Sequence, residues 1–199
     1  MKTRLMATLP IIGLLWLAAP LAAEPREFTI DPDQFSIVFS VDHVGFNDRF
    51  GMFLEGEGRF LYDEDNNRLH EGEVVIQASS VFTNHRRRDN HVRNPDFLDA
   101  RRHGEIRFVA TEWAPVDDDV HHGALHGELT LLGETHPVTL ETRINKIARY
   151  PFGHEQHTIG ISATTTIQRS QWGMDYGIED GLVGDDVHLI FEFEALAED

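Results

Sequence analysis

Apolar and polar residues alternate with a period of two along most of the chain after residue 24. In the last such segment, polar residues that include His188, Glu192 and Glu194 separate Val187, Leu189, Phe191 and Phe193. Successive side chains of a β-strand point to opposite faces, so this spacing predicts strands with one dry and one wet face. Similar segments recur at residues 37–42, 73–78, 106–111, 125–131, 138–145 and 159–167. This many strands predicts an all-β antiparallel domain, either a closed barrel or a sandwich.

The first 23 residues have the composition of a secretory signal peptide. Lys2 and Arg4 precede the apolar run Leu5–Ala19, and small residues follow before the first acidic side chain. A basic start, a short apolar core and a small-residue end are typical of a cleaved export signal. We therefore expect residues 1–23 to be a signal peptide and residues 24–199 to be one periplasmic domain with no stable membrane insertion.

Charge and cysteine content exclude several classes of function. The formal net charge is −17 at pH 7, and the chain contains no cysteine. A strongly negative protein repels nucleic acid, so we expect no nucleic-acid partner. Without cysteine there is no disulfide and no thiol chemistry, so burial of apolar side chains must hold the exported domain together.

Residues 84–102 interrupt the alternation, and we expect a short helical or irregular segment there. This segment concentrates positive charge in an arginine island, formed by Arg86, Arg87, Arg88, Arg93, Arg101 and Arg102. Arginine binds carboxylates and phosphates in a planar, paired geometry. The island is compatible with a head-group site at a barrel mouth. We favour the alternative, a solvated face that balances an acidic exterior, because surface charge pairs are common and individually weak.

Histidines are the second candidate for chemistry. His121, His122 and His126 lie close together, and His154 and His157 follow later. The pattern lacks the spacing of a helical zinc site, and His126 falls on the wet face of its strand. No nucleophile elbow, phosphate loop or dinucleotide motif is present. We expect no enzyme activity, no catalytic residue, no metal site and no cofactor, with a metal-dependent hydrolase of small lipids as an open alternative.

Thirteen phenylalanines form the third unusual feature. Many fall on the dry face of a predicted strand or beside residues 84–102. A barrel of about eight strands is just wide enough to be filled by side chains or to hold one small ligand. Alternation alone does not choose between a solid core and a cavity.

Several short motifs, in order, resemble the YceI-like family of periplasmic polyisoprenoid-binding proteins from Phe28 to Ala195. The motifs are His43 with Gly51-Met52-Phe53, Thr83 with Arg88-Asp89-Asn90-His91, Asp96-Phe97-Leu98-Asp99, Gly127-Glu128-Leu129-Thr130-Leu131-Leu132-Gly133, Arg169-Ser170-Gln171-Trp172-Gly173, and Val183-Gly184-Asp185-Asp186-Val187. The chain departs from the family at His103-Gly104 and at Gln171-Trp172, where the family usually has an aromatic-proline pair and Asp-Phe.

The resemblance implies a single antiparallel, lipocalin-like β-barrel of about eight strands. It also implies that the barrel binds a long apolar isoprenoid lipid, either a polyprenyl chain or an isoprenoid quinone, without catalysis. The expected ligand-binding residues are Phe39, Val41, Phe50, Phe53, Phe97, Phe108, Leu129, Ile161, Trp172, Phe191 and Phe193. Arg88 and Asp89, with Arg169 as partner, are expected to order a lid near the head group. A homodimer and a membrane electron-transfer partner, docked through the arginine island, are open alternatives.

Overall fold

The computed structural model describes residues 24–198, and the predicted signal peptide lies outside them. The elements are β1 (Arg26–His43), β2 (Asn47–Phe53), β3 (Gly56–Asp63), β4 (Arg68–Gln77), the 3₁₀ helix η1 (Ala78–Ser80), β5 (Val81–Phe82), α1 (Arg86–Val92), β6 (Glu105–Val116), β7 (Asp119–Leu131), β8 (Glu134–Arg149), β9 (His157–Gln168), the 3₁₀ helix η2 (Arg169–Trp172) and β10 (Val183–Ala197).

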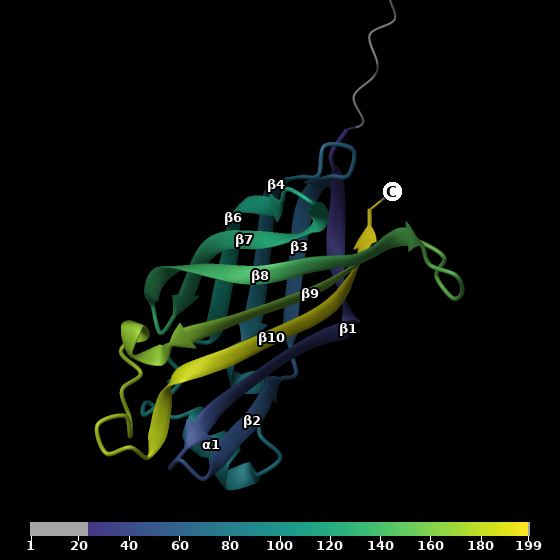
Figure 1. Cartoon of the computed structure of the whole chain (residues 1–199). Helices are drawn as coiled ribbons and strands as arrows, with labels where there is room; N and C mark the ends of the chain where they lie inside the picture. The colour runs from purple at the N-terminus through teal and green to yellow at the C-terminus, as the bar shows by residue number, and fades with distance from the viewer. Residues whose placement is uncertain (1–23, 199) are drawn as a thin grey trace, which may run out of the picture.

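The strands form one antiparallel sheet in the order β10-β9-β8-β7-β6-β4-β3-β1-β2-β5, and pairing of β10 with β1 closes it (Figure 1). β3 pairs with residues 26–29 of β1, and β2 pairs with residues 37–43, so both cover the same long strand. The result is the predicted closed barrel of eight strands with one short helix. α1 lies at one end of the barrel, and the C-terminus lies at the other.

Local sequence explains how neighbouring strands meet. β7 and β8 are joined by Leu132 and Gly133, whose φ angles are 54° and 82°. Two successive positive φ angles are those of a type I′ turn, whose twist matches that of the flanking strands. The two-residue connection fixes the register, so that Leu131 lies opposite Glu134.

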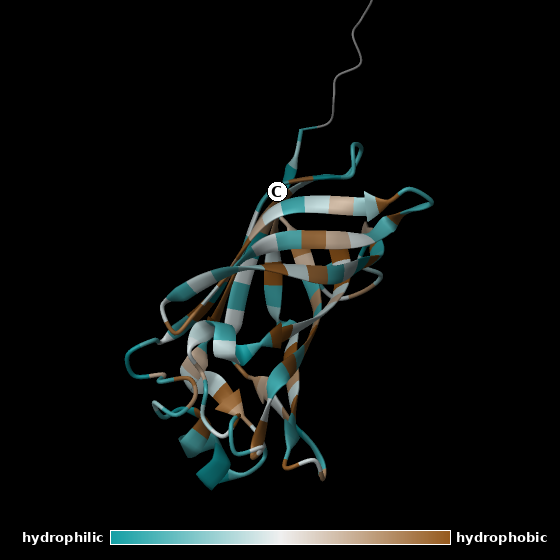
Figure 2. Ribbon diagram, turned by 60° about the vertical axis from the view of Figure 1, so that its left-hand side comes forward, coloured by the Kyte–Doolittle hydropathy of each residue, from teal (hydrophilic) through white to brown (hydrophobic). Residues whose placement is uncertain are grey.

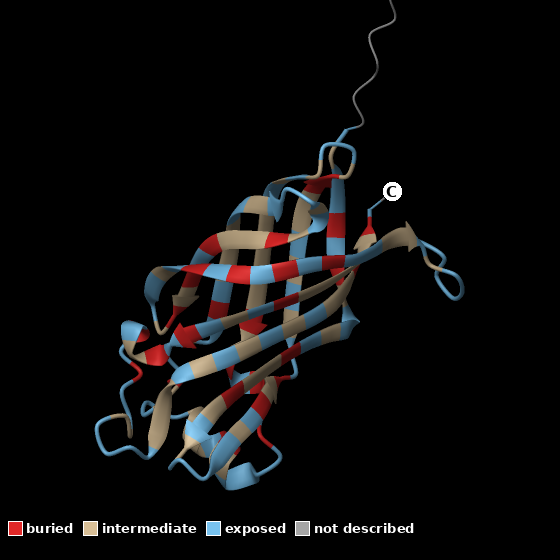
Figure 3. Cartoon of the chain, viewed as in Figure 1, coloured by how far each residue is buried: buried red, intermediate tan, exposed pale blue. Residues whose placement is uncertain are grey.

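The predicted alternation of dry and wet positions is present on most strands. On β8, the buried residues Val138, Leu140 and Ile144 alternate with exposed ones such as Glu141 and Arg143. Figure 3 shows the same alternation as red and pale-blue bands, and Figure 2 shows it as alternating brown and teal bands. The dry faces of all the strands therefore meet inside the barrel.

The interior is organised as two apolar clusters. One lies toward α1 and includes Ile37, Phe53 and Trp172. The other lies toward the opposite end and includes Phe28, Tyr62 and Ile159. Within residues 24–198, no helix combines the length and hydropathy needed to cross a bilayer.

Candidate functional site

Two cavities lie in series inside the barrel. The distal chamber, away from α1, is lined by residues that include Phe60, Leu69, Trp113, Ile161 and Phe193, and encloses about 1080 Å³ not filled by atoms, including space open to solvent. The helix-end chamber is lined by residues that include Phe39, Val41, Phe53, Phe97 and Met174, and encloses about 870 Å³ on the same measure.

The two chambers meet at a waist of shared residues. Ile76, Ile106, Leu129, Leu189 and Phe191 line both. These side chains come from β4, β6, β7 and β10, so the waist spans opposite walls of the barrel. Space for a long, narrow apolar molecule therefore runs along most of the barrel axis.

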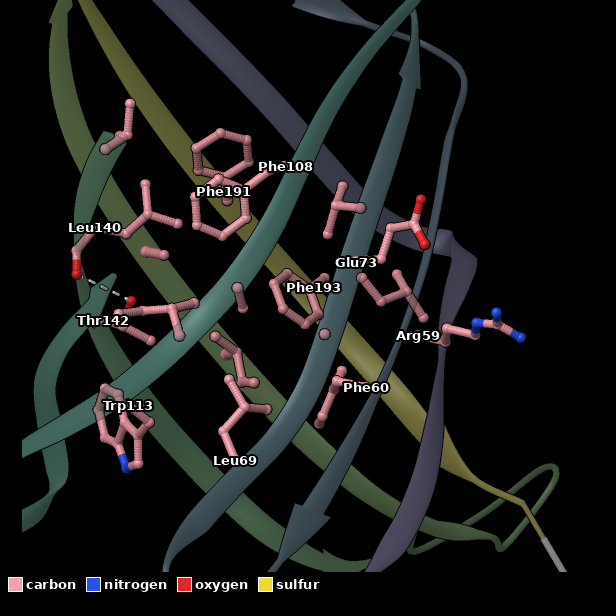
Figure 4. A pocket seen from close by; sticks show the side chains of 18 of the residues that line it. Arg59, Phe60, Leu69, Glu73, Phe108, Trp113, Leu140, Thr142, Phe191 and Phe193 are labelled. Carbon is pink, nitrogen blue, oxygen red and sulfur yellow. Dashed lines mark hydrogen bonds between the residues drawn. The ribbon is translucent and has the colours of Figure 1, made fainter. Parts of the chain in front are cut away.

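Most of the polar side chains at the distal chamber bond to groups in the barrel wall. The Thr142 hydroxyl donates to the Leu140 carbonyl at 3.4 Å, and the Thr165 hydroxyl donates to the Thr139 carbonyl at 2.9 Å. Figure 4 shows Arg59 and Glu73 directed away from the aromatic rings, and Glu73 accepts from Arg107. A ligand in this chamber meets hydrocarbon on all sides.

A polar network of Tyr62, Asn67 and Trp113 lies at the far end of the distal chamber. The Tyr62 hydroxyl and the Trp113 indole N–H both donate to the side-chain oxygen of Asn67, the latter at 3.0 Å. The Asn67 amide donates to the Val120 carbonyl at 2.8 Å, which ties the β3–β4 turn to β7. Burial, followed by the negative charges of Glu64 and Asp63, raises the pKa of Tyr62 to about 12. Tyr62 therefore remains a neutral donor at physiological pH.

The segment that contains α1 covers the helix-end chamber. Its residues Val92, Phe97 and Leu98 line the cavity. Asp89 accepts hydrogen bonds from the Thr83 N–H at 2.7 Å and the Thr83 hydroxyl at 2.6 Å. Arg88 donates to the hydroxyl and the carbonyl of the same threonine. Arg88 and Asp89 therefore tie the start of the segment to the end of β5.

Opposing effects act on the ionisation of Asp89. Burial alone would raise its pKa, but hydrogen bonds from Thr83 and the positive charges of Arg93 and Arg88 outweigh burial and lower the pKa. The ionised carboxylate is the form that accepts both Thr83 hydrogen bonds and is stabilised by them.

Arg169 orders a different loop from the one expected. Its guanidinium donates to the carbonyls of Met174, Tyr176, Val183 and Gly184 at 2.6–2.9 Å. These bonds hold residues 174–184, and no bond in the described chain joins Arg169 to Arg88 or Asp89. Arg169 does contact the α1 segment, because its guanidinium carbon lies 5.7 Å from the centre of the Phe97 ring.

Nine of the predicted ligand-binding residues line the chambers. Phe108, Ile161 and Phe193 line the distal chamber, Phe39, Val41, Phe53 and Phe97 line the helix-end chamber, and Leu129 and Phe191 line both. Trp172 is instead packed in the wall, with 2% of its surface exposed, and its indole N–H donates to the Leu129 carbonyl at 3.1 Å.

The expectation that Phe50 binds ligand is wrong, because its side chain lies on the outer face of β2 and is 63% exposed. Phe50 and Phe53 are three residues apart, and a regular strand places residues at odd separations on opposite faces. Phe53 lies opposite the buried Ile37, whereas Phe50 lies opposite Ser40.

The histidines do not converge on a metal site. Within residues 24–198, no three His, Asp or Glu side chains are grouped so that they could hold an ion. His122 contacts Glu141, and His126 contacts Thr139, both across the outer faces of β7 and β8. The hydrolase alternative therefore has no ligand set in the described chain.

The sequence reasoning missed part of the site. The waist residues Ile76, Ile106 and Leu189 were not among the expected ligand contacts. Each occupies a dry strand position, so the alternation of apolar and polar residues is the signal that could have revealed them.

Comparisons with known proteins agree with this architecture. A model of the YceI-like domain matches residues 28–195. A UPF0312 protein of Vibrio parahaemolyticus is 32% identical over 194 residues, which cover 95% of this chain and 97% of that protein.

Solved structures share the fold. The Campylobacter jejuni YCEI protein has a TM-score of 0.70 at 24% identity, over 79% of this chain and 90% of that chain. A polyisoprenoid binding domain from Saccharophagus degradans has a TM-score of 0.65 at 12% identity, over 86% of this chain and 98% of that one. The match over most of the chain and the shared barrel together place this protein in the YceI-like family.

Proposed function

We propose that this protein binds a long isoprenoid lipid in its barrel and acts as a periplasmic carrier or buffer of that lipid. The observation that carries the proposal is the pair of chambers joined at the Phe191 waist, whose lining side chains are predominantly apolar. Burial of apolar area contributes about 25 cal/mol per Å², so a prenyl chain that covers several hundred Å² supplies ample free energy for binding.

The comparisons support the same class of ligand. The Saccharophagus domain, which shares the fold, is a polyisoprenoid binding domain. A polyprenyl chain and the tail of an isoprenoid quinone are both long, narrow and apolar, as a ligand of two chambers in series has to be. We propose binding without catalysis, export through residues 1–23, and no resident cofactor. A homodimer and a membrane electron-transfer partner stay predictions.

The direct test is to identify what the protein carries. Protein purified from the periplasm of its native host is extracted with organic solvent, and the extract is analysed by mass spectrometry. We expect a prenyl-chain lipid at up to one molecule per chain. A protein that yields no such lipid, and that shows no saturable binding of a prenyl chain when one is added, would contradict the proposal.

A further inference from the structure

The inner face of the β1–β2 pair changes from apolar to basic where it leaves the helix-end chamber. Directly opposed residues of antiparallel strands project from the same face. Ile37 lies opposite Phe53, Phe39 lies opposite Gly51, and Val41 lies opposite Arg49. Phe39, Phe53 and Val41 line the chamber. Arg49 therefore projects to the same inner side, two residues from Gly51 and nearer the barrel end.

Arg49 has no protein partner in the described chain. It is half-buried, and no side-chain hydrogen bond to it is present in residues 24–198. Within those residues, the arginines paired with a carboxylate inside 4.0 Å are Arg26, Arg102, Arg107, Arg143 and Arg149. Half-buried cations are ordinarily paired, because burial removes part of their hydration.

The acidic side chains closest in sequence point the other way. Asp48 and Asp42 lie opposite each other, one residue along from the Arg49–Val41 pair, and therefore project from the outer face. Asp42 also accepts a hydrogen bond from the Gly45 N–H at 3.0 Å. The inner side of this barrel end thus presents a guanidinium without a neighbouring carboxylate on the same strand pair.

A second guanidinium adds positive charge to the same chamber. Arg169 lines the helix-end chamber and is 2% exposed, and its hydrogen bonds go to neutral carbonyls. Asp185 and Asp175 act on it from beyond salt-bridge distance, and Asp185 is hydrogen-bonded to Ser170. Arg169 therefore places a buried positive charge in the wall of this chamber, partly offset by these two aspartates.

The geometry points to Arg49 as the residue that receives an anionic head group, a phosphate or a carboxylate, of a lipid whose hydrocarbon chain fills the two chambers. This inference rests on the proposed lipid-binding function. The side chains that line the chambers are predominantly apolar, and the Arg59 side chain in the distal wall is directed away from the aromatic rings (Figure 4), so a charged head is best placed at the barrel end. Arginine is suited to this role because its planar donors match both kinds of oxyanion.

The test compares ligands that share one tail. Geranylgeranyl monophosphate, geranylgeranoic acid and the neutral geranylgeraniol are titrated against the mature protein at low and high salt. A hydrogen bond to a charged group is stronger than a neutral one, so we expect both anions to bind about tenfold or more tightly than the alcohol at low salt. In Arg49→Gln this preference should vanish, while the affinity for the alcohol stays unchanged.

Matched variants separate the site from general charge. Arg68→Gln removes the same charge from an exposed position at the start of β4, toward the opposite barrel end, and should leave the preference intact. Arg49→Lys keeps the charge and should retain part of the preference. If the thermal melt shows that Arg49→Gln does not fold, the test is instead the salt dependence of anion binding to the Arg49→Lys protein.

The outcomes distinguish this inference from the proposed function. Equal affinity of the wild-type protein for the alcohol and both anions would overturn the head-group site and leave lipid binding in place. A preference that survives in Arg49→Gln would overturn the role of Arg49. A quinone with the same tail that binds as tightly as the anions would overturn the anionic class. If none of the prenyl probes binds, the proposed function itself fails. A preference for only one anion supports the site and identifies the head group.

Discussion

At the scale of single residues, two glycines leave room for aromatic rings inside the barrel. A Cβ atom added at Gly51 would lie 2.2 Å from the ring of Phe39, and one added at Gly127 would lie 2.3 Å from the ring of Phe108. Both rings line chambers. The missing side chains therefore set where the rings lie and how much interior space remains.

We expect Gly51→Ala to weaken lipid binding. The added methyl group must displace the Phe39 ring, which costs about 1–3 kcal/mol of stability as overpacking and alters the wall of the helix-end chamber. Gly160→Ala is the matched control, because a Cβ there meets nothing within 4 Å. Binding titrations and thermal melts on both proteins check this. The double variant Phe39→Leu, Gly51→Ala should recover binding, and a Gly51→Ala protein with wild-type affinity would show that Phe39 does not shape the chamber.

Adjacent residues on β10 should respond in opposite ways to substitution. Phe191→Asp places an unpaired carboxylate at the waist, which costs several kcal/mol and should lower both the melting temperature and ligand affinity. Glu192 is exposed and accepts from the Ser162 hydroxyl at 2.6 Å. Glu192→Gln keeps an acceptor there and should shift stability by less than about 0.5 kcal/mol. Equal losses in the two melts would mean that the assigned strand faces are wrong.

At the scale of elements, the arginine island divides into two groups. Arg88 and Arg93 donate to backbone or side-chain oxygens at the end of β5 and beside it. Arg86 and Arg87 are exposed at the start of α1, with no ion pair in the described chain. The island is therefore partly an anchor and partly a solvated surface.

This division predicts different effects on ligand release. Arg88→Ala removes two donors to Thr83, so the α1 segment should open more often and release lipid faster. Arg87→Ala should alter only the salt dependence of association, as charges at the rim of an interface do. The measurement is transfer of a fluorescent prenyl lipid to acceptor vesicles at low and high salt. Identical release from both variants and the wild type would show that the whole island is surface charge.

The Thr83–Asp89 contact should respond to acid. The pKa of Asp89 is lowered in the folded protein, so its ionised form stabilises the fold above the unfolded-state pKa of about 4. That contribution is lost as pH falls through the folded-state pKa. We expect Asp89→Asn to melt below the wild type at pH 7 and the gap to shrink at pH 3. The exposed Glu128→Gln is the control, and a gap that stays constant with pH would contradict the assignment.

At the scale of the whole molecule, alternation was enough to predict an all-β antiparallel domain with one dry face per strand, because a two-residue period assigns each side chain to a face without knowledge of its partners. The choice of a closed barrel over a sandwich came from the family resemblance. The helix within residues 84–102 followed from the break in that period. Contacts that depend on register or loop path were beyond reach. Three such features depend on how distant segments meet: the strand face that carries Phe50, the position of Arg49 opposite Val41, and the loop held by Arg169.

The continuous pairing of β10 with β1 has a kinetic consequence. This ladder runs from Phe28–Ala197 to His43–Val183, with two irregularities, so a ligand cannot leave between β10 and β1 without breaking strand pairing. A tail that leaves the distal chamber lengthwise, toward α1, slides past the Phe191 waist. Each buried methylene contributes about 0.8 kcal/mol.

Dissociation should therefore slow steeply as prenyl units are added, and then level off once the tail is longer than the two chambers. Stopped-flow release of tails from two to ten isoprene units would trace this curve, with the break marking the length that the barrel holds. Release rates that do not vary with tail length would mean that the barrel opens along a strand pair. The residence time of the lipid would then depend on the stability of that strand pairing and not on the length of the lipid.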